Sequence, residues 1–261
     1  SRASSLEAYA QDPHSCQGPG RSGHAVLPLH VHVARLVEGQ RGAVRVGDGD
    51  DAGVAALDVE RVALAVHAGA GRGDHRAGVV PIMTVFTRKR IPFAASLPWK
   101  EKLVKVASYD CASFPMLQDL AGSFARLIVS TGATFDDEIA KASEILKASG
   151  KPYAMLHCVT SYPNTLAQAH LARMDWLRQF APEVGWSDHT LVARDGIKAA
   201  KAALALGADY VERHFTILRA DATKDGPGSI NPDQLRELAD FAKRPREERM
   251  AMLEREIPDW R

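Results

Sequence analysis

From Lys102 onward the chain repeats one pattern, in which a short apolar stretch rich in β-branched or aromatic residues is followed by an amphipathic stretch with helical spacing. Five such units recur at a period of about 25 to 30 residues, which is typical of parallel strands joined by helical crossovers. The predicted strands are Lys102 to Ser108, Arg126 to Thr131, Pro152 to Cys158, Val184 to Trp186 and Tyr210 to Thr216. The predicted helices are Phe114 to Ala121, Asp136 to Ala148, Val192 to Ala208 and Pro232 to Lys243. We therefore expect an α/β fold, and 261 residues are enough for a (β/α)8 TIM barrel.

Polar side chains gather late in these predicted strands or just after them. In a TIM barrel the loops that follow the strands converge on one mouth, where the chemistry takes place. We expect one pocket to collect Lys105, Ser108, Ser130, Thr131, His157, Ser187, Asp188, His189, Glu212 and His214. Two of these, His189 in GWSDHT and His214 in YVERHFT, lie where neighbouring strands end and are predicted to form a metal site.

Five motifs in this part of the chain carry a family resemblance: VKVASYD, VSTGA, LHCVTSYP, WSDHT and ERHFT, between Lys102 and Leu238. In this order and spacing they resemble the sialic acid (N-acetylneuraminate) synthase family, which condenses phosphoenolpyruvate with an N-acetylated amino sugar. The resemblance implies an enzyme, a carbon–carbon bond-forming transferase that makes a nine-carbon sialic acid from a sugar of the N-acetylmannosamine type and releases phosphate. It does not specify which nine-carbon acid is made.

The resemblance also implies roles for individual residues. Lys105, Asp110, Tyr162 and Asp225 fall at catalytic positions, and Ser108, Ser130, Thr160 and Ser187 at substrate-binding positions. A lysine and hydroxyl donors suit the phosphate and carboxylate of phosphoenolpyruvate, because charge-assisted hydrogen bonds are the strong ones. His189 and His214 would hold a divalent cation, Mn²⁺ or Mg²⁺, that activates the sugar aldehyde as a Lewis acid.

Four positions depart from the family pattern. Thr160 stands where the family has asparagine, Asp110 where it has glutamate, and Asp225 is followed by glycine instead of histidine. The shorter carboxylate at Asp110 is expected to change the preferred sugar. Arg213 replaces a lysine, and the two are not equivalent where geometry is exacting.

The first 80 residues differ in composition from the rest. They contain no Lys, Ile, Phe, Trp, Met, Asn or Thr, yet hold six of the ten histidines. The glutamate-bearing and lysine-bearing motifs that the family carries in its first strands are missing. We therefore treat residues 1–80 as an atypical low-complexity segment and expect the barrel to be incomplete or irregular over its N-terminal third. Our hypothesis is that this segment is an out-of-frame or reverse-strand translation, which translation of the gene's other frames would test.

Domain boundaries follow from this break. Residues 81–243 are predicted to form the barrel and residues 244–261 a charged helical tail with a solvated face. Within the barrel, Ile91 to Pro98 resembles the family's third strand, so the third helix is expected to be missing. The small antifreeze-like domain of many family members is expected to be absent, which leaves the family's homodimer open.

Two alternatives to an active synthase stay open. One is a catalytically inactive partial barrel of the same family. The other is an amidohydrolase-like metal hydrolase built from the His30 to His32 pair, with His157 and Asp188 as further ligands. Within the synthase interpretation, His157 either packs or touches substrate, and Cys158 is expected to be a core residue.

Composition sets the remaining bounds. A net charge of +1 gives no basic excess for nucleic acid, and no 18-residue apolar run predicts a membrane span. The polar start does not resemble a signal peptide, and the three cysteines have no disulfide or metal spacing. These features predict a cytoplasmic protein.

Overall fold

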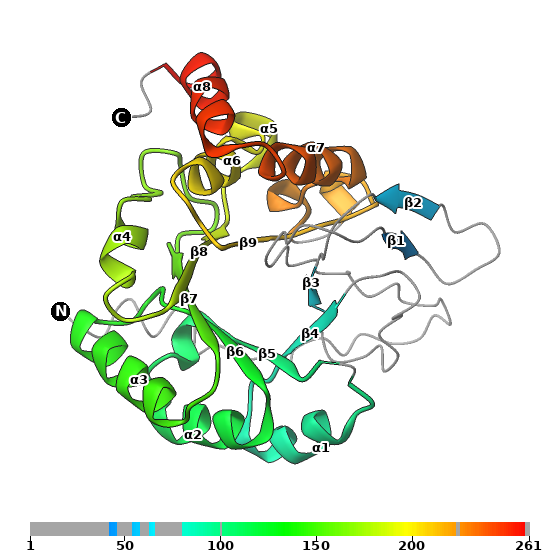
Figure 1. Ribbon diagram of the computed structural model, residues 1–261. Helices are drawn as coiled ribbons and strands as arrows, with labels where there is room; N and C mark the ends of the chain where they lie inside the picture. The colour runs from blue at the N-terminus through cyan, green and yellow to red at the C-terminus, as the bar shows by residue number, and fades with distance from the viewer. Residues whose placement is uncertain are drawn as a thin grey trace.

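The computed structural model describes residues 80–99, 101–222 and 225–258, together with the backbone of the short strands β1 (Gly42–Arg45), β2 (Val54–Leu57) and β3 (Ala63–Ala65). Strands β1 and β2 pair antiparallel, apart from the main sheet. The main sheet has seven parallel strands, β3 to β9, in chain order. They continue as β4 (Val80–Thr84), β5 (Leu103–Val106), β6 (Arg126–Ser130), β7 (Tyr153–Cys158), β8 (Glu183–Asp188) and β9 (Tyr210–Arg213). The sheet curls round an arc, so the predicted TIM-barrel-like fold is confirmed as a partial barrel (Figure 1).

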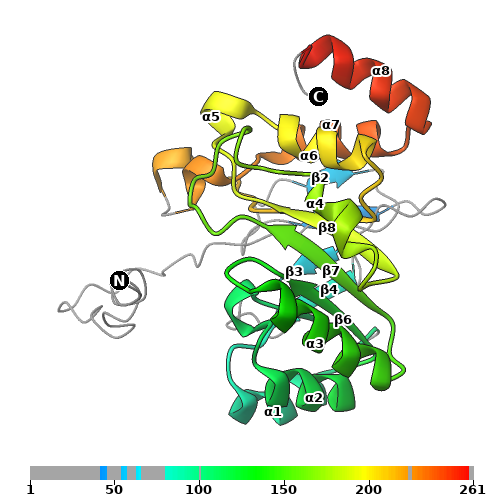
Figure 2. The same ribbon diagram turned by 90° about the vertical axis from the view of Figure 1, so that its left-hand side faces the viewer.

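Helices cover the outer side of this curved sheet. They are α1 (Ile91–Ser96), α2 (Phe114–Ser123), α3 (Asp136–Ala148), α4 (Arg173–Leu177), α5 (Val192–Asp195), α6 (Lys198–Ala205), α7 (Pro232–Ala242) and α8 (Arg246–Glu256). Helices α1 to α3 lie at one end of the arc, and α5 to α8 lie at the other (Figures 1 and 2). The five strands predicted from Lys102 onward are all present, and α3 has the predicted bounds.

The prediction for Ile91 to Pro98 was wrong, because this segment forms α1 and not a strand. A proline in its first turn suits a helix start, and Ile91 and Ala94 bury the same face at helical spacing. The strand before it is β4, which pairs in parallel with β5. Helix α1 is therefore the crossover between β4 and β5, and the helix that was expected to be missing is present.

The single helix predicted from Val192 to Ala208 is divided in two. Helix α5 ends at Gly196, whose φ of 59° lies in the left-handed region that favours glycine. Helix α6 then packs on β8 and β9. The alanine periodicity could not reveal this break, because a lone glycine is tolerated in a helical pattern.

The sheet has two apolar faces. The inner face packs Ile82, Ile128, Ala154, Leu156 and Tyr210 against one another inside the arc. The outer face, which includes Met155 and Trp186, packs under the helices in a larger core. Because side chains alternate between the two faces along each strand, position in the strand decides which end-of-strand residues reach the interior.

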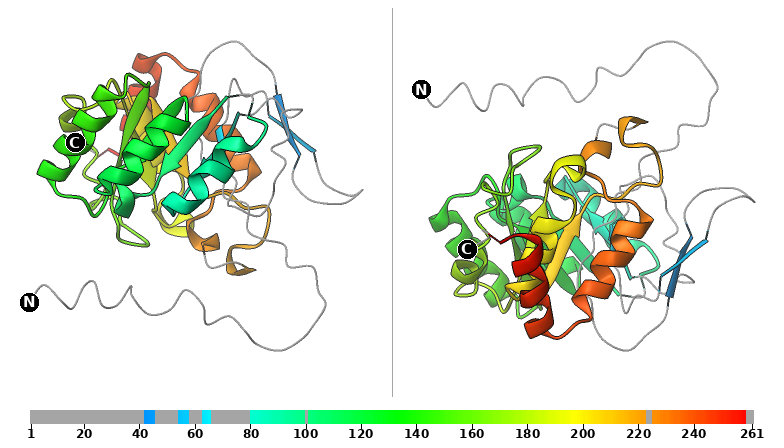
Figure 3. Two further views of the ribbon diagram at one scale, coloured as in Figure 1. Left: turned by 90° about the horizontal axis from the view of Figure 1, so that it is seen from below. Right: turned by 90° about the horizontal axis from the view of Figure 1, so that it is seen from above.

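The charged tail is helix α8, and it docks on α6 (Figure 3). Leu253 is fully buried there, and the ammonium of Lys201 on α6 lies 2.8 Å from Glu256 and 2.7 Å from Glu237 of α7. The predicted solvated face is present, since most charged side chains of α8 are exposed. Among the described residues, no helix has the length and apolar character needed to cross a membrane.

Candidate active site

The inner face of the sheet becomes polar at the carboxyl ends of the strands. The ammonium of Lys105 on β5 donates to Ser130 Oγ on β6 at 2.7 Å and to the carbonyl of Val106 at 2.8 Å. It also lies 3.3 Å from Glu212 Oε2 on β9. Lys105 is only 5% exposed, so this charge is buried with its partners. The curvature of the sheet thus brings β9 across to β5, and the polar side chains meet inside the arc.

The two predicted metal ligands lie together in this interior. The ring centroids of His189 and His214 are 5.5 Å apart, and the rings are inclined by 61°. His189 is 7% exposed. Burial, and after it the neighbouring His214, lowers the pKa of His189 to about 3. The ring is therefore neutral near pH 7, which is the form that binds metal ions.

The donor set fits a cation that keeps open positions. Two imidazoles at this spacing can share one ion, whereas among the described residues no group of three or more His, Cys, Asp and Glu side chains is placed to hold one. The remaining positions of a bound cation would fall to water or substrate, as in catalytic metal sites in general. His189 and His214 are the residues of the described chain that fit this role.

Cys158 is buried, as the sequence predicted, and it also belongs to the same cluster. Its Sγ lies 3.9 Å from His189 Nδ1, and hydrogen bonds from Ser108 and Ser187 act on the thiol. Burial raises the pKa of Cys158, and these hydrogen bonds oppose the rise. A signal was available in the sequence, because Cys158 is two residues after Leu156 and must share its inward face.

Glu212 is the second functional side chain that the sequence left without a role. It lies on β9, two residues before His214, and pairs with Lys105. The period-two alternation that places His214 inside the arc also places Glu212 there. Buried charges are retained in proteins when they are paired, and here the pair joins Lys105 to the strand that leads into the predicted metal ligand His214.

The loop after β7 carries two of the predicted site residues, Tyr162 and Thr160. The ring of Tyr162 is 55% exposed and its centroid lies 4.0 Å from that of His189. Thr160 is also exposed, and its methyl group lies close to Gly132. A Cβ at Gly132 would come within 3.0 Å of both the Thr160 methyl and Cys158 Sγ, so only glycine leaves room for this loop.

Asp110 and Asp225 lie in loops at the same end of the barrel. Asp110 is in the turn after β5, and its Oδ2 is buried without a hydrogen-bond partner among the described residues. Burial raises the pKa of Asp110. Asp225 begins the turn Gly226–Gly228 in the loop that leaves β9 and returns beside it, where the Ile230 amide donates to the His214 carbonyl at 2.8 Å. No described hydrogen bond joins Asp110 to the cluster around Lys105.

His157 does not join the pocket, contrary to the expectation that one pocket collects all these residues. It faces outward, where its Nε2 is 2.8 Å from the Ala169 carbonyl and its ring packs on Trp186. Asp188 also faces outward and forms a buried ion pair with Arg213. The amidohydrolase arrangement therefore loses both of these further ligands, while the His30 to His32 pair lies outside the described residues.

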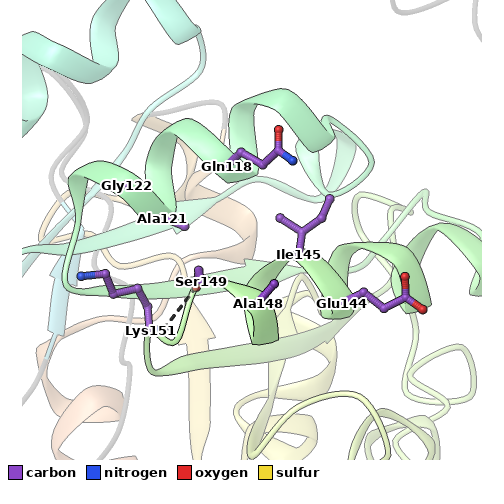
Figure 4. Close-up of a pocket in the computed structure, with 8 residues that line it drawn as sticks. All are labelled: Gln118, Ala121, Gly122, Glu144, Ile145, Ala148, Ser149 and Lys151. Atoms are coloured by element: carbon purple, nitrogen blue, oxygen red, sulfur yellow. Dashed lines mark hydrogen bonds between the residues drawn. The ribbon is translucent and has the colours of Figure 1, made fainter.

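A separate groove of about 560 Å³ lies between α2 and α3 on the outer helix layer (Figure 4). Gln118 and Ala121 line one wall, and Glu144 and Ala148 line the other. None of the predicted site residues borders it. In TIM barrels chemistry is placed at the carboxyl ends of the strands, and this groove lies outside the helix layer that covers them.

Comparison with known proteins shows which proteins this chain is similar to. The sequence profile of the NeuB family matches residues 65–250. The chain is 35% identical over 138 residues to N-acetylneuraminate-9-phosphate synthase of Drosophila melanogaster. It is 34% identical over 141 residues to N,N'-diacetyllegionaminic acid synthase of Campylobacter jejuni. Each alignment covers 52% of this chain, but only 36% and 41% of the respective relative, so the chain spans well under half of their length.

A solved structure gives the same picture. The N-acetylneuraminic acid (sialic acid) synthetase of Leptospira borgpetersenii, determined with citrate, superposes with a TM-score of 0.60 at 25% identity. The superposition covers 71% of this chain and 68% of that one. The similarity therefore extends over most of the described barrel.

Proposed function

Because the chain belongs to the NeuB family, we propose that its barrel condenses phosphoenolpyruvate with an N-acetylated amino sugar to give a nine-carbon sugar acid and phosphate. The observation that carries the proposal is the meeting of Lys105, three serine hydroxyls and two histidines inside one arc. Cation and hydroxyl donors suit an anionic enol phosphate, and the imidazoles suit a metal ion beside it.

In this proposal Lys105 holds the carboxylate or phosphate of phosphoenolpyruvate together with Ser108, Ser130 and Ser187. The ammonium donates to Val106 and Ser130, and its charged partner is the Glu212 carboxylate, with which it forms an ion pair. An incoming anion would therefore take the place of the Glu212 carboxylate on Lys105. The exchange keeps a negative partner on the buried cation throughout binding.

His189 and His214 would hold the divalent cation, Mn²⁺ or Mg²⁺, which when bound polarises the aldehyde oxygen of the open-chain sugar. The methylene carbon of phosphoenolpyruvate then forms the new bond to the aldehyde carbon, whose oxygen takes up a proton. Water adds to the cationic carbon that carried the enol, and loss of phosphate leaves a ketone. Tyr162, Asp110, Thr160 and Asp225 would face the sugar in the loops around this interior.

We propose an N-acetylmannosamine-type substrate as the first to test. The named relatives include an N-acetylneuraminate-9-phosphate synthase and a diacetyllegionaminic acid synthase, so the choice of sugar is the finer part of the proposal. A homodimer and a cytoplasmic location remain predictions, and sedimentation velocity of the purified chain would test the first.

The test measures inorganic phosphate released from MnCl2, phosphoenolpyruvate and N-acetylmannosamine, with reactions that omit the sugar or the metal as blanks. We expect release only with all three components, and its loss in His189→Ala and His214→Ala. His170→Ala is a matched control, because His170 is exposed and lies in the loop before α4. Without release from any of several N-acetylated amino sugars, but with Mn²⁺ still bound, the chain would be the inactive partial barrel. That alternative is motivated by the missing first-strand motifs.

A further inference from the structure

A buried ionic cluster lies directly behind the two histidines, on the outer face of β8 and β9. Arg213 and Asp188 are both 0% exposed and form an ion pair. Arg213 Nη1 donates to Thr190 Oγ1 at 2.7 Å, and Nη2 donates to the Thr190 carbonyl at 2.7 Å. Asp188 Oδ1 accepts from the Thr190 amide at 2.9 Å and from its hydroxyl at 2.8 Å. Three side chains from two strand ends therefore form one connected network.

The place of this network relative to the metal ligands is specific. Asp188 and Thr190 are the residues on either side of His189, and Arg213 immediately precedes His214. Because side chains alternate along a strand, Arg213 points under the helices while His214 points into the arc. The Arg213 guanidinium thus contacts both residues that flank His189, and Arg213 itself is the residue directly before His214.

The cost of burying this ion pair indicates a role other than stabilising the fold. Burying two charges costs several kcal/mol per ion before their attraction is counted, and apolar residues of similar volume often serve a core equally well. What a guanidinium supplies beyond an apolar side chain is a rigid, planar fork with fixed donor directions. Here the guanidinium contacts two atoms of Thr190 and one atom of Asp188. It therefore fixes the ends of β8 and β9 relative to each other.

We propose that Arg213 is a positioning residue, which with Asp188 and Thr190 sets the relative placement of the His189 and His214 rings and thereby the affinity for a divalent cation. The proposal rests on the proposed function only for the identity of the cation site. The hydrogen bond from the Asn164 amide to the His189 carbonyl, 3.2 Å long, extends the held segment to the loop after β7.

The test measures Mn²⁺ binding to the full chain by the electron paramagnetic resonance signal of the free ion. Asp188→Leu with Arg213→Met replaces the ion pair by apolar side chains of similar size. We expect Mn²⁺ affinity to fall 10- to 100-fold, as on loss of an outer-shell partner, with the urea midpoint close to that of the unmodified chain. Arg213→Lys keeps one charge but not the fork, and we expect a dissociation constant between the two. Mn²⁺ affinity equal to that of the unmodified chain in both variants overturns the proposal.

A matched control comes from the opposite end of the same strands. Arg126 donates to Glu183 Oε2 at 2.7 Å and also to Tyr210, near the amino ends of β6, β8 and β9. Arg126→Met should lower stability without changing Mn²⁺ affinity, which separates positioning from general loosening. If Arg126→Met weakens Mn²⁺ binding as much as Arg213→Lys does, the positioning role is refuted.

Failure of the proposed function would be visible separately. If the unmodified chain binds no Mn²⁺, the proposed metal site is refuted. Hydrogen exchange in the metal-free chain still tests whether Arg213 fixes this segment. The amides of Thr190 and Asn164 should exchange faster in Arg213→Lys than in the unmodified chain and in Arg126→Met. Equal exchange at both amides in all three chains would show that Arg213 does not fix this segment. The Arg213→Lys chain also decides the matter if the double variant fails to fold.

Discussion

Lys105 and Glu212 form an ion pair across the interior of the barrel, with 3.3 Å between Nζ and Oε2 and with both side chains almost fully buried. The pair joins β5 to β9, two strands that are far apart in the order of the sheet. It therefore spans the interior of the arc by side-chain contact, at the level where the predicted substrate anion would bind.

Removing one partner of this pair should be costly. We expect Lys105→Met to lower the free energy of unfolding by about 3 kcal/mol, because it leaves a buried carboxylate without its cation. Adding Glu212→Gln in the same chain should restore most of the loss. Urea denaturation of both variants measures this. Equal stability of Lys105→Met and the unmodified chain would contradict this expectation.

Divalent metal should stabilise the chain through the two histidines. At Mn²⁺ one hundred times above its dissociation constant, we expect the free energy of unfolding to rise by about 2.7 kcal/mol, since only the folded chain places both rings together. EDTA should reverse the effect, and His214→Ala should abolish it. The measurement is thermal unfolding with and without Mn²⁺. A rise of the same size in His214→Ala would place the bound ion elsewhere.

Acid should destabilise the fold through His157. Burial lowers the pKa of His157 to about 4, against about 6.5 in an unfolded chain. Between these two pKa values the unfolded chain binds a proton at His157 and the folded chain does not. The free energy of unfolding is therefore unaffected above pH 6.5 and falls by up to about 3 kcal/mol as the pH drops to 4.

The variant His157→Gln isolates this effect. Its amide can still donate to the Ala169 carbonyl but does not titrate, and His189 titrates in both chains. Urea denaturation at pH 7 and pH 4.5 should therefore show a smaller acid loss in the variant. An equal loss would assign the acid sensitivity to other groups.

The docking of helix α8 should depend more on the buried side chain of Leu253 than on the ion pairs of Lys201. Leu253→Ala creates a cavity at a fully buried position and should cost about 2 to 4 kcal/mol. Lys201→Met removes the contacts to Glu237 and Glu256 but leaves these carboxylates in contact with water, so we expect a loss of about 1 kcal/mol or less. Limited proteolysis of residues 246–256, compared between the two variants, tests the order. Faster cleavage in Lys201→Met than in Leu253→Ala would contradict it.

Hydrophobic periodicity was enough to predict the strands and most helices, because each strand after Lys102 is apolar on both faces and each helix has a buried stripe. The resemblance to the family's third strand failed at Ile91 to Pro98, where a short apolar run fits either a strand or a helix. The proline near its start was the available signal for a helix. The break at Gly196 depends on a local backbone conformation that composition does not reveal.

The site was predicted less completely than the fold. Motif order found His189, His214, Lys105 and the serines, which now lie inside one arc, but it treated every polar residue near a strand end as facing inward. Alternation along the strands separates them, and it sends His157 and Asp188 outward while it brings Cys158 and Glu212 in. The pairing of Lys105 with Glu212 required the curvature of the sheet, which no local pattern encodes.

The opposed faces of β8 and β9 have a consequence for how this part of the gene can change. Inserting or deleting one residue between Trp186 and Thr190 would rotate Asp188 into the mouth and His189 into the apolar layer, and the matching slip in β9 would do the same to Arg213 and His214. Neighbouring side chains can compensate for a single substitution. A change of length here instead moves two charged side chains into the positions of two imidazoles in one step. We expect variation in length among related chains to be confined to the connecting loops, with these two strand ends kept free of gaps.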